Sequence, residues 1–383
     1  MDNIYSVAAF LFFAAVLAAI LSNRLKISLA LMEIIVGTII GFGAFRFGVF
    51  DKLSLNAEWL KFCAGVGAML LTFLAGAELN PDTVKRKIRE VSVVGIIGFA
   101  APFIGCFLVS YYLIGWNLSA SLLCGIALST TSMAVVYTVM LEYGFNKTEF
   151  GKGVLGACFI NDLGTVIALG LIFAPFTWRT VVFILVTVVL IFTLRPMTDF
   201  IIRHFANKTA AIRTKWILFI LLSMGVLALW SGSEPVLPAY VLGMVLAKTM
   251  ENDGNFVRRL RTVTIGFLTP LYFLRAGALV SIPALVTAPL VFLLLFVGKV
   301  VSKIFGLYPV ISRFRKDRRE KRYYTLLMST GLTFGTISAL YGLSNNLISE
   351  EQYSLIVGAV IASAIIPTII ANKWFLPSHL LKK

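Results

Sequence analysis

Few residues of this sequence could carry chemistry, because charged side chains are rare within its apolar runs. Asp162 is the one carboxylate deep inside such a run, and Asn161 precedes it. The basic residues that interrupt apolar runs are Arg275, Lys299 and Lys303. Removing an ionisable side chain from water is costly, so each of these positions is a functional hypothesis until a structural reason for it is found.

Two hydroxyl-rich stretches accompany these charges. The first, residues 128–133, contains Thr130, Thr131 and Ser132. The second, residues 329–336, contains Gly331, Thr333 and Gly335. Hydroxyl side chains compete for backbone hydrogen bonds and glycine adds backbone freedom, so each stretch predicts an interruption within a helix. For either stretch alone, an ordinary small-residue packing face between helices is the alternative.

The elements that position these residues follow from the composition. Of the 383 residues, 59% are hydrophobic and 14% are charged, whereas soluble domains carry about 25% charged residues. This excludes an ordinary soluble enzyme, a disordered chain and a secreted disulfide scaffold, and it indicates an all-α integral membrane protein. The four cysteines lie in apolar runs without CxxC or metal-binding spacing. The first apolar run is expected to be a retained span rather than a signal peptide.

Thirteen apolar runs are candidate transmembrane helices. They cover about residues 4–22, 28–46, 59–78, 91–114, 119–141, 153–175, 179–202, 215–230, 235–250, 262–280, 285–308, 322–342 and 353–373. Loops after odd-numbered spans, with the C-terminal end, hold 27 of the 34 Lys and Arg, and loops after even-numbered spans hold four. Basic residues collect in cytoplasmic loops, so we predict an external N-terminus and a cytoplasmic C-terminus. The same rule explains the net charge of +16 without a nucleic-acid partner.

The two hydroxyl-rich stretches fall at matching places in this order. Spans 1–6 and 8–13 make two halves that span 7 joins, and each stretch lies in the fifth span of its half. The odd total also inverts the second half relative to the first. Paired interrupted helices in inverted halves are typical of the midplane binding site of a secondary transporter.

Asp162 and Lys299 are expected at similar depth. Each lies about nine residues, or roughly 14 Å, from the cytoplasmic end of its span. An unpaired buried charge is expensive, so we predict that Lys299 neutralises Asp162 when the site is empty. A snorkelling lysine is the alternative for Lys299. Lys303 lies nearer the end of the same span and is expected to be a more superficial lysine.

A monovalent cation fits the remaining groups. Na⁺ or K⁺ needs oxygen ligands and a compensating negative charge, which Asp162 supplies. Further oxygen ligands can come from carbonyls near Thr131 and from the hydroxyls of Thr130, Thr131 and Ser132. Asn161 offers an amide oxygen, or a donor that orients the ligands. A carboxylate that holds either a proton or a cation is the minimal exchanger.

Three further charges lie outside this group. Arg275, nearer the outer face, is interpreted as structural or snorkelling. Glu33 and Glu78 lie about a turn from the cytoplasmic ends of their spans. They either draw cations toward a cytoplasmic funnel or pair with neighbouring basic loop residues.

Together these features resemble a known family. The chain is similar to monovalent cation:proton antiporter family 2, the NapA- and Kef-like branch of the Na⁺/H⁺ exchanger superfamily. The resemblance covers essentially the whole chain and rests on Thr131-Ser132, Asn161-Asp162, Gly298-Lys299-Val300, residues 328–335 and residues 76–79. It implies an NhaA/NapA-like fold: an inverted 6+6 repeat with a linker helix and two discontinuous helices that cross.

The resemblance also implies an assembly and a mechanism. Its domains would be a dimerisation domain of residues 1–80 and 213–280, a core of residues 90–176 and 284–374, and a linker helix of residues 177–212. A homodimer in the cell membrane would carry the ions by elevator-type movement in pH homeostasis. Asp162 would be the shared carboxylate, Thr131 a backbone ligand and Lys299 the basic partner. Membrane lipids are expected partners, no cofactor is implied, and a regulatory nucleotide domain would need a separate polypeptide or a longer gene product.

One departure bears on stoichiometry. Electrogenic members usually carry two adjacent aspartates, and Asn161 takes the first of these positions, which favours electroneutral exchange of one cation for one proton. Electroneutral members often have Arg where this chain has Lys299. If Lys299 also lost a proton on cation binding, two protons would move for each cation. The ligand set accepts both Na⁺ and K⁺, and the second hydroxyl-rich stretch favours the Kef-like side.

Other classes of function fit less well. A cation channel, or a channel-like Kef-type K⁺ efflux protein, is the main alternative, although channels usually rely on rings of identical groups. A buried acid argues against a transporter of organic anions. We expect no enzymatic activity, because His204 and His379 lie near span ends or in loops and no GxSxG or HExxH motif occurs.

Overall fold

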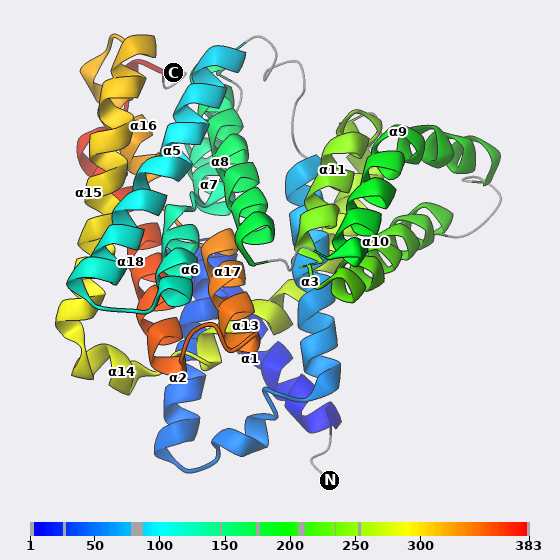
Figure 1. Cartoon of the computed structure of the whole chain (residues 1–383), viewed down its shortest axis with the longest axis horizontal. Coiled ribbons are helices and arrows are strands. Elements are labelled where there is room, and N and C mark those ends of the chain that lie inside the picture. The colour runs from blue at the N-terminus through cyan, green and yellow to red at the C-terminus, as the bar shows by residue number, and fades with distance from the viewer. Residues whose placement is uncertain are drawn as a thin grey trace. The chain divides into compact units, whose positions relative to one another are not determined.

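The computed structural model describes residues 4–25, 28–77, 87–145, 148–173, 177–205, 211–233, 235–251 and 254–380. Regular structure in these ranges is helical, without a strand (Figure 1). Ten of the described helical segments are long and apolar enough to cross a membrane. The protein is therefore an all-helical, multi-pass membrane protein, as its composition predicts.

The chain forms two compact units. The first contains residues 1–57, 83–165 and 273–383, and the second contains residues 58–82 and 166–272. Two of the boundaries between them fall within α8 (Glu149–Phe173) and α13 (Thr269–Ala278). This division groups residues 1–57 with the segments of the predicted core. It describes compactness alone, so the predicted dimerisation and core domains stay a prediction.

Most helices belong to the first unit. They are α1 (Ile4–Leu25), α2 (Leu29–Arg46), α5 (Ile88–Leu108), α6 (Leu118–Ser129), α7 (Met133–Glu142), α14 (Ile282–Thr287), α15 (Pro289–Phe314), α16 (Arg318–Met328), α17 (Thr333–Ser344) and α18 (Glu350–Trp374). Short turns are η1 (Phe50–Leu53) and η5 (Ser378–Leu380), and a π-helical turn η2 (Val109–Leu113) extends α5. The second unit contains α3 (Glu58–Ala77), α9 (Trp178–Phe205), α10 (Ile212–Ser231), α11 (Val236–Glu251), α12 (Gly254–Val263) and the π-helical η4 (Thr264–Leu268).

All thirteen predicted runs coincide with helical segments, but several differ from a simple spanning helix, among them residues 322–342, which form α16 and α17. Residues 119–141 form the two short helices α6 and α7, and α11 has 16 residues. Residues 262–280 form η4 and α13 rather than one α-helix. The exact number of membrane spans therefore stays a prediction.

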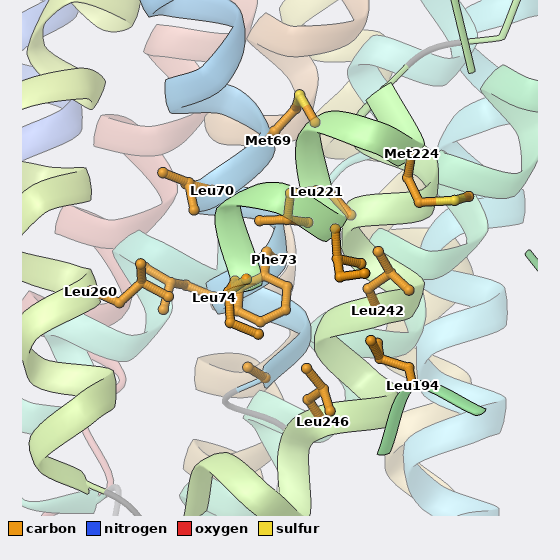
Figure 2. Packing of buried hydrophobic residues seen from close by; sticks show 14 of the residues in the cluster. Met69, Leu70, Phe73, Leu74, Leu194, Leu221, Met224, Leu242, Leu246 and Leu260 are labelled. Atoms are coloured by element: carbon orange, nitrogen blue, oxygen red, sulfur yellow. The ribbon is translucent and has the colours of Figure 1, made fainter. Parts of the chain in front are cut away.

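The second unit is held by a cluster of buried apolar side chains (Figure 2). Phe73 and Leu74 of α3 pack with Leu242 and Leu246 of α11 in this cluster. The backbones of α3 and α11 approach closely, because a Cβ at Gly243 would collide with the Phe73 carbonyl. Small residues at such contacts are typical of helix packing in membranes.

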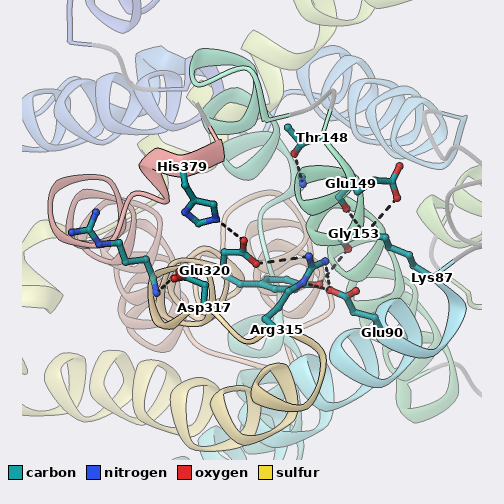
Figure 3. A network of polar contacts seen from close by, with 12 residues as sticks. Lys87, Glu90, Thr148, Glu149, Gly153, Arg315, Asp317, Glu320 and His379 are labelled. Atoms are coloured by element: carbon teal, nitrogen blue, oxygen red, sulfur yellow. Dashed lines mark hydrogen bonds and ion pairs between the residues drawn. The ribbon is translucent and has the colours of Figure 1, made fainter. Parts of the chain in front are cut away.

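Polar contacts connect helix ends in the first unit (Figure 3). Arg315 donates from Nη2 and Nε to one oxygen of Glu90 at 2.6 and 2.9 Å. Glu320 lies 3.9 Å from Arg315 and 2.9 Å from His379 Nε2. This network joins the start of α5, the end of α15, the start of α16 and the turn η5.

Asp317 begins α16 as its N-cap. Its carboxylate accepts hydrogen bonds from the backbone N–H groups of Arg319 at 2.8 Å and Glu320 at 2.9 Å. These two hydrogen bonds hold the pKa of Asp317 below its usual value, and the bond from the Glu320 N–H has the larger effect. The cap is therefore complete at neutral pH and weakens only as the pH falls through that lowered pKa.

Candidate functional site

Both hydroxyl-rich stretches interrupt helices, as predicted. Residues 130–132 separate α6 from α7, and Thr130 is extended with φ −62° and ψ 151°. Residues 329–332 separate α16 from α17. The two stretches meet, because the backbone N–H of Ser132 donates to the Thr330 carbonyl at 3.1 Å. Segments almost 200 residues apart in the chain thus form one crossing, which we call the helix crossing.

Asn161 of α8 holds the first interruption in place. Its Oδ1 accepts a hydrogen bond from the Thr131 N–H at 2.8 Å, and its Nδ2 donates to the Ser129 carbonyl at 3.3 Å. The side chain is fully buried. Of the two roles predicted for Asn161, this geometry supports the one that orients the ligands, since both ends of its amide are engaged.

Asp162 follows Asn161 and is 1% exposed. Its Oδ1 has no hydrogen-bond partner among the described residues, and no ion pair joins it to a described lysine or arginine. A buried carboxylate oxygen without a protein partner is costly unless a proton or a cation satisfies it. Among the described residues, Glu33 Oε2 is the other carboxylate oxygen that is buried without a partner.

Lys303 is the residue that the sequence prediction misjudged. Although it lies nearer the end of α15, it is fully buried, and its Nζ donates to Thr131 Oγ1 at 2.7 Å. Thr131 Oγ1 in turn donates to the Met328 carbonyl at 2.8 Å. The expectation of a superficial Lys303 is therefore wrong.

A signal for Lys303 was present in the sequence. Residues four apart on a helix lie on the same face, so Lys303 points to the same side of α15 as Lys299. The distance of Lys303 from the end of its span was a misleading guide to its burial, because this distance says nothing about the direction in which the side chain points.

Lys299 is fully buried beside the second interruption. Its Nζ has no hydrogen-bond partner among the described residues. The atom lies against Gly331, where a Cβ would collide with it, and Thr130 Oγ1 is 3.1 Å from the same Cβ position. Gly331 thus makes room for the lysine. The role of Lys299 as the basic partner of Asp162 stays a prediction.

The hydroxyl groups of the first interruption have different partners. Thr130 Oγ1 donates to the Ala127 carbonyl at 3.0 Å, and Ser132 Oγ accepts a hydrogen bond from the Val135 N–H at 3.2 Å. Thr131 Oγ1 is engaged on both sides by Lys303 and Met328. Of these three hydroxyls, Thr130 is therefore the one that accepts no hydrogen bond from a described residue.

The other predicted residues fall at different distances from this network. Gly335 packs against the crossing, since its Cβ position is 3.0 Å from Thr130 Oγ1. Thr333 begins α17 and is half-buried. Glu33 of α2 is 1% exposed, with an unpartnered Oε2, and takes no part in the hydrogen bonds of the crossing. Glu78 lies outside the described residues.

Arg275 is buried and donates to the Leu55 carbonyl at 2.7 Å, which fits the structural interpretation and not a snorkelling one.

A family comparison covers nearly the whole chain. Residues 11–375 match the model of the family described as "Sodium/hydrogen exchanger, transmembrane". The chain belongs to this family, as its motifs predict. It is a membrane protein of the cation/proton antiporter class.

Individual relatives agree with this class. The chain is 26% identical over 332 residues to the probable Na⁺/H⁺ antiporter 3 of Methanocaldococcus jannaschii, covering 83% of this chain and 84% of that protein. It is 25% identical to cation/H⁺ antiporter 18 of Arabidopsis thaliana and 24% identical to the glutathione-regulated potassium-efflux system protein KefC of Enterobacter. Those alignments cover 89% and 93% of this chain but only 44% and 58% of the relatives. Each relative is a transporter by name, in line with the expectation that the chain is not an enzyme.

The fold has a solved counterpart. The sodium proton antiporter MjNhaP1 of Methanocaldococcus jannaschii superposes with a TM-score of 0.70 over 97% of this chain and 99% of that chain. The sequence identity is 15%, so the likeness concerns the fold. The two proteins share one fold over nearly their whole length.

Proposed function

We propose that the protein exchanges one monovalent cation, Na⁺ or K⁺, for one proton across the cell membrane, and that Asp162 binds the two ions in turn. The observation that carries this proposal is the buried Asp162 Oδ1 without a protein partner. It lies one residue after the amide that holds the first helix interruption. A cation and a proton satisfy the same oxygen, so they compete for it.

The charge balance supports electroneutral exchange. One carboxylate gains one positive charge from either ion, so the net charge of the Asp162 site is the same in both loaded states. Lys303 keeps its hydrogen bond to Thr131 in this scheme. If Lys299 or Lys303 released a proton when the cation binds, two protons would move for each cation and the exchange would be electrogenic.

The ligand set consists of oxygen atoms, which Na⁺ and K⁺ both accept. Besides Asp162, we assign the Thr131 carbonyl, which lies between α6 and α7, and the Thr130 hydroxyl, which keeps free lone pairs. The names of the relatives include both Na⁺/H⁺ antiporters and a potassium-efflux protein. The ion is therefore the first quantity to measure.

We further propose that a homodimer works by elevator-type movement. Residues 90–176 and 284–374 would carry the ions, and residues 1–80 and 213–280 would form the dimer contact. The N-terminus would lie outside the cell and the C-terminus in the cytoplasm, as the loop charges indicate. Glu33 and Glu78 would attract cations at the cytoplasmic entrance.

Proteoliposomes with an acidic interior test the central claim. We expect external Na⁺ or K⁺ to dissipate the pH gradient through the wild-type protein, and the Asp162→Asn variant to lose this flux. Asp199→Asn is the matched control, because Asp199 lies in α9 of the second unit and accepts a hydrogen bond from Thr249 that asparagine can keep. Cation-dependent proton flux through Asp162→Asn would refute the assignment.

Two further readouts separate the remaining alternatives. A membrane-potential dye should show no potential during one-for-one exchange, whereas two protons for each cation would generate one. A cation current that moves no protons would instead indicate the channel-like alternative, and single-channel recording would then identify it.

A further inference from the structure

A cavity of about 310 Å³ opens in the first unit, and none of its lining residues belongs to the helix crossing. Its lining consists of Ile304, Tyr308, Arg322, Thr325, Leu326 and Phe375. These residues come from the C-terminal half of α15, the middle and second half of α16 and the position that follows α18. The cavity therefore lies between α15, α16 and the end of α18.

Two strong hydrogen-bond donors in this cavity have no protein acceptor. The Arg322 guanidinium lies 5.1 Å from the Phe375 ring, and it makes no hydrogen bond or ion pair with a described residue. The Tyr308 hydroxyl likewise has no hydrogen-bond partner among the described residues. By contrast, the Thr325 hydroxyl donates to the Lys321 carbonyl at 2.8 Å. Both side chains are exposed, Tyr308 at 37%, so the cavity opens to its surroundings and presents a cation and a hydroxyl that no described protein group engages.

The neighbouring Arg315 shows that acidic partners are available at this end of the unit. Arg315 uses its guanidinium on Glu90 and Glu320 and lies over the Phe150 ring. Arg322 faces no carboxylate of this kind. An arginine left without an acid matches the planar, bidentate binding of a phosphate group.

The rest of the cavity is apolar and lies next to lipid-facing side chains. Ile304, Leu326 and Phe375 supply hydrocarbon surface. Phe305 of α15 is 75% exposed and Trp374 of α18 is 60% exposed. Large exposed apolar and aromatic side chains near the ends of membrane helices face the lipid and its headgroup region. The seven basic residues between Arg313 and Arg322 add positive charge at this level.

We propose that this cavity binds an anionic phospholipid. The phosphate accepts hydrogen bonds from Arg322 and Tyr308, and one acyl chain lies along Ile304, Leu326 and Phe375. The proposal is independent of the transported ion and of the role of Asp162. It places a lipid on α15, the helix that also carries Lys299 and Lys303.

Native mass spectrometry of the detergent-solubilised protein tests the proposal. We expect dioleoyl phosphatidylglycerol to bind more tightly than dioleoyl phosphatidylcholine. Arg322→Gln should weaken phosphatidylglycerol binding about tenfold, as expected for the loss of a charge-assisted hydrogen bond. Tyr308→Phe, which removes only the hydroxyl group, should weaken it less. Arg318→Gln is the matched control, because Arg318 is exposed one turn earlier on α16 and does not line the cavity.

Three outcomes would overturn the proposal. The first is unchanged phosphatidylglycerol binding by Arg322→Gln, and the second is an equal loss in Arg318→Gln. The third is displacement of the lipid by inorganic phosphate or glycerol 3-phosphate at similar concentrations, which would indicate a free-phosphate site instead. Thermal unfolding without added lipid checks that each variant is folded.

Discussion

The two helix interruptions are held open in different ways. Side chains from other helices hold the first one, since Asn161 binds the backbone at Ser129 and Thr131 and Lys303 binds the Thr131 hydroxyl. In the second interruption, Ser329 and Thr330 donate to carbonyls of their own helix, at Thr325 and Leu327. An added Cβ would collide with neighbouring atoms at Gly331 in the second interruption and at Gly335 in the first turn of α17.

This difference separates two tasks within one crossing. The first interruption is tied to polar groups whose charge or hydrogen bonding can respond to an ion. The second interruption provides space, including the space that Lys299 occupies above Gly331. Each interruption therefore faces one lysine of α15. Lys303 donates a hydrogen bond to Thr131 in the first interruption, whereas Lys299 lies against Gly331 in the second without a hydrogen bond.

The largest effect on stability is expected at the first interruption. Asn161→Ala would leave the Thr131 N–H and the Ser129 carbonyl without their buried partner. Two such losses cost about 2–6 kcal/mol. Thermal unfolding of the purified protein should show a large decrease in midpoint, together with loss of exchange. A midpoint near that of the wild type would show that the amide does not hold the interruption.

Gly331→Ala tests the space-providing role of the second interruption. The added Cβ would collide with Lys299 Nζ, so the lysine must move within a packed interior. Such overpacking costs about 1–3 kcal/mol. We expect a moderate decrease in the unfolding midpoint and reduced exchange.

The double variant Gly331→Ala with Lys299→Ala sharpens this test. Removing the lysine side chain should restore much of the lost stability if the collision with Nζ is the cause. Additive losses would instead mean that Gly331 is needed for its backbone conformation.

The two lysines offer a direct comparison between the interruptions. Lys303→Met removes the hydrogen bond to Thr131, whose backbone N–H is bound by Asn161, the neighbour of Asp162. We expect a strong loss of exchange, because the first interruption loses one of the contacts that hold it. Lys299→Met should reduce exchange less, since Lys299 Nζ makes no hydrogen bond with a described residue, and this reverses the expectation from sequence. A larger loss of exchange for Lys299→Met would restore Lys299 as the main basic partner.

The smallest effect is expected for Thr333→Ala. Thr333 is half-buried, and its hydroxyl makes no hydrogen bond with a described residue. The change in unfolding free energy should stay within about 0.5 kcal/mol, and exchange should remain close to that of the wild type. Strong loss of exchange without loss of stability would show that the Thr333 hydroxyl binds the ion.

Much of this architecture could be predicted because the membrane imposes strong local rules. Apolar runs of sufficient length must become helices, since lipid offers no hydrogen bonds to the backbone. Both interruptions were predictable from their hydroxyl and glycine content, as were the family and the buried Asp162. Arg275 was predicted as a structural or snorkelling residue, and its bond to the Leu55 carbonyl distinguishes the two.

The tertiary structure decided how the crossing is held together. No local rule pairs Asn161 with Thr131, because the two lie 30 residues apart and meet only when α8 packs beside the first interruption. The burial of Lys303 likewise depends on which face of α15 turns inward. Hydrophobicity determined which segments cross the membrane, while hydrogen bonds between distant helices determined where the buried polar groups find partners and where Asp162 does not.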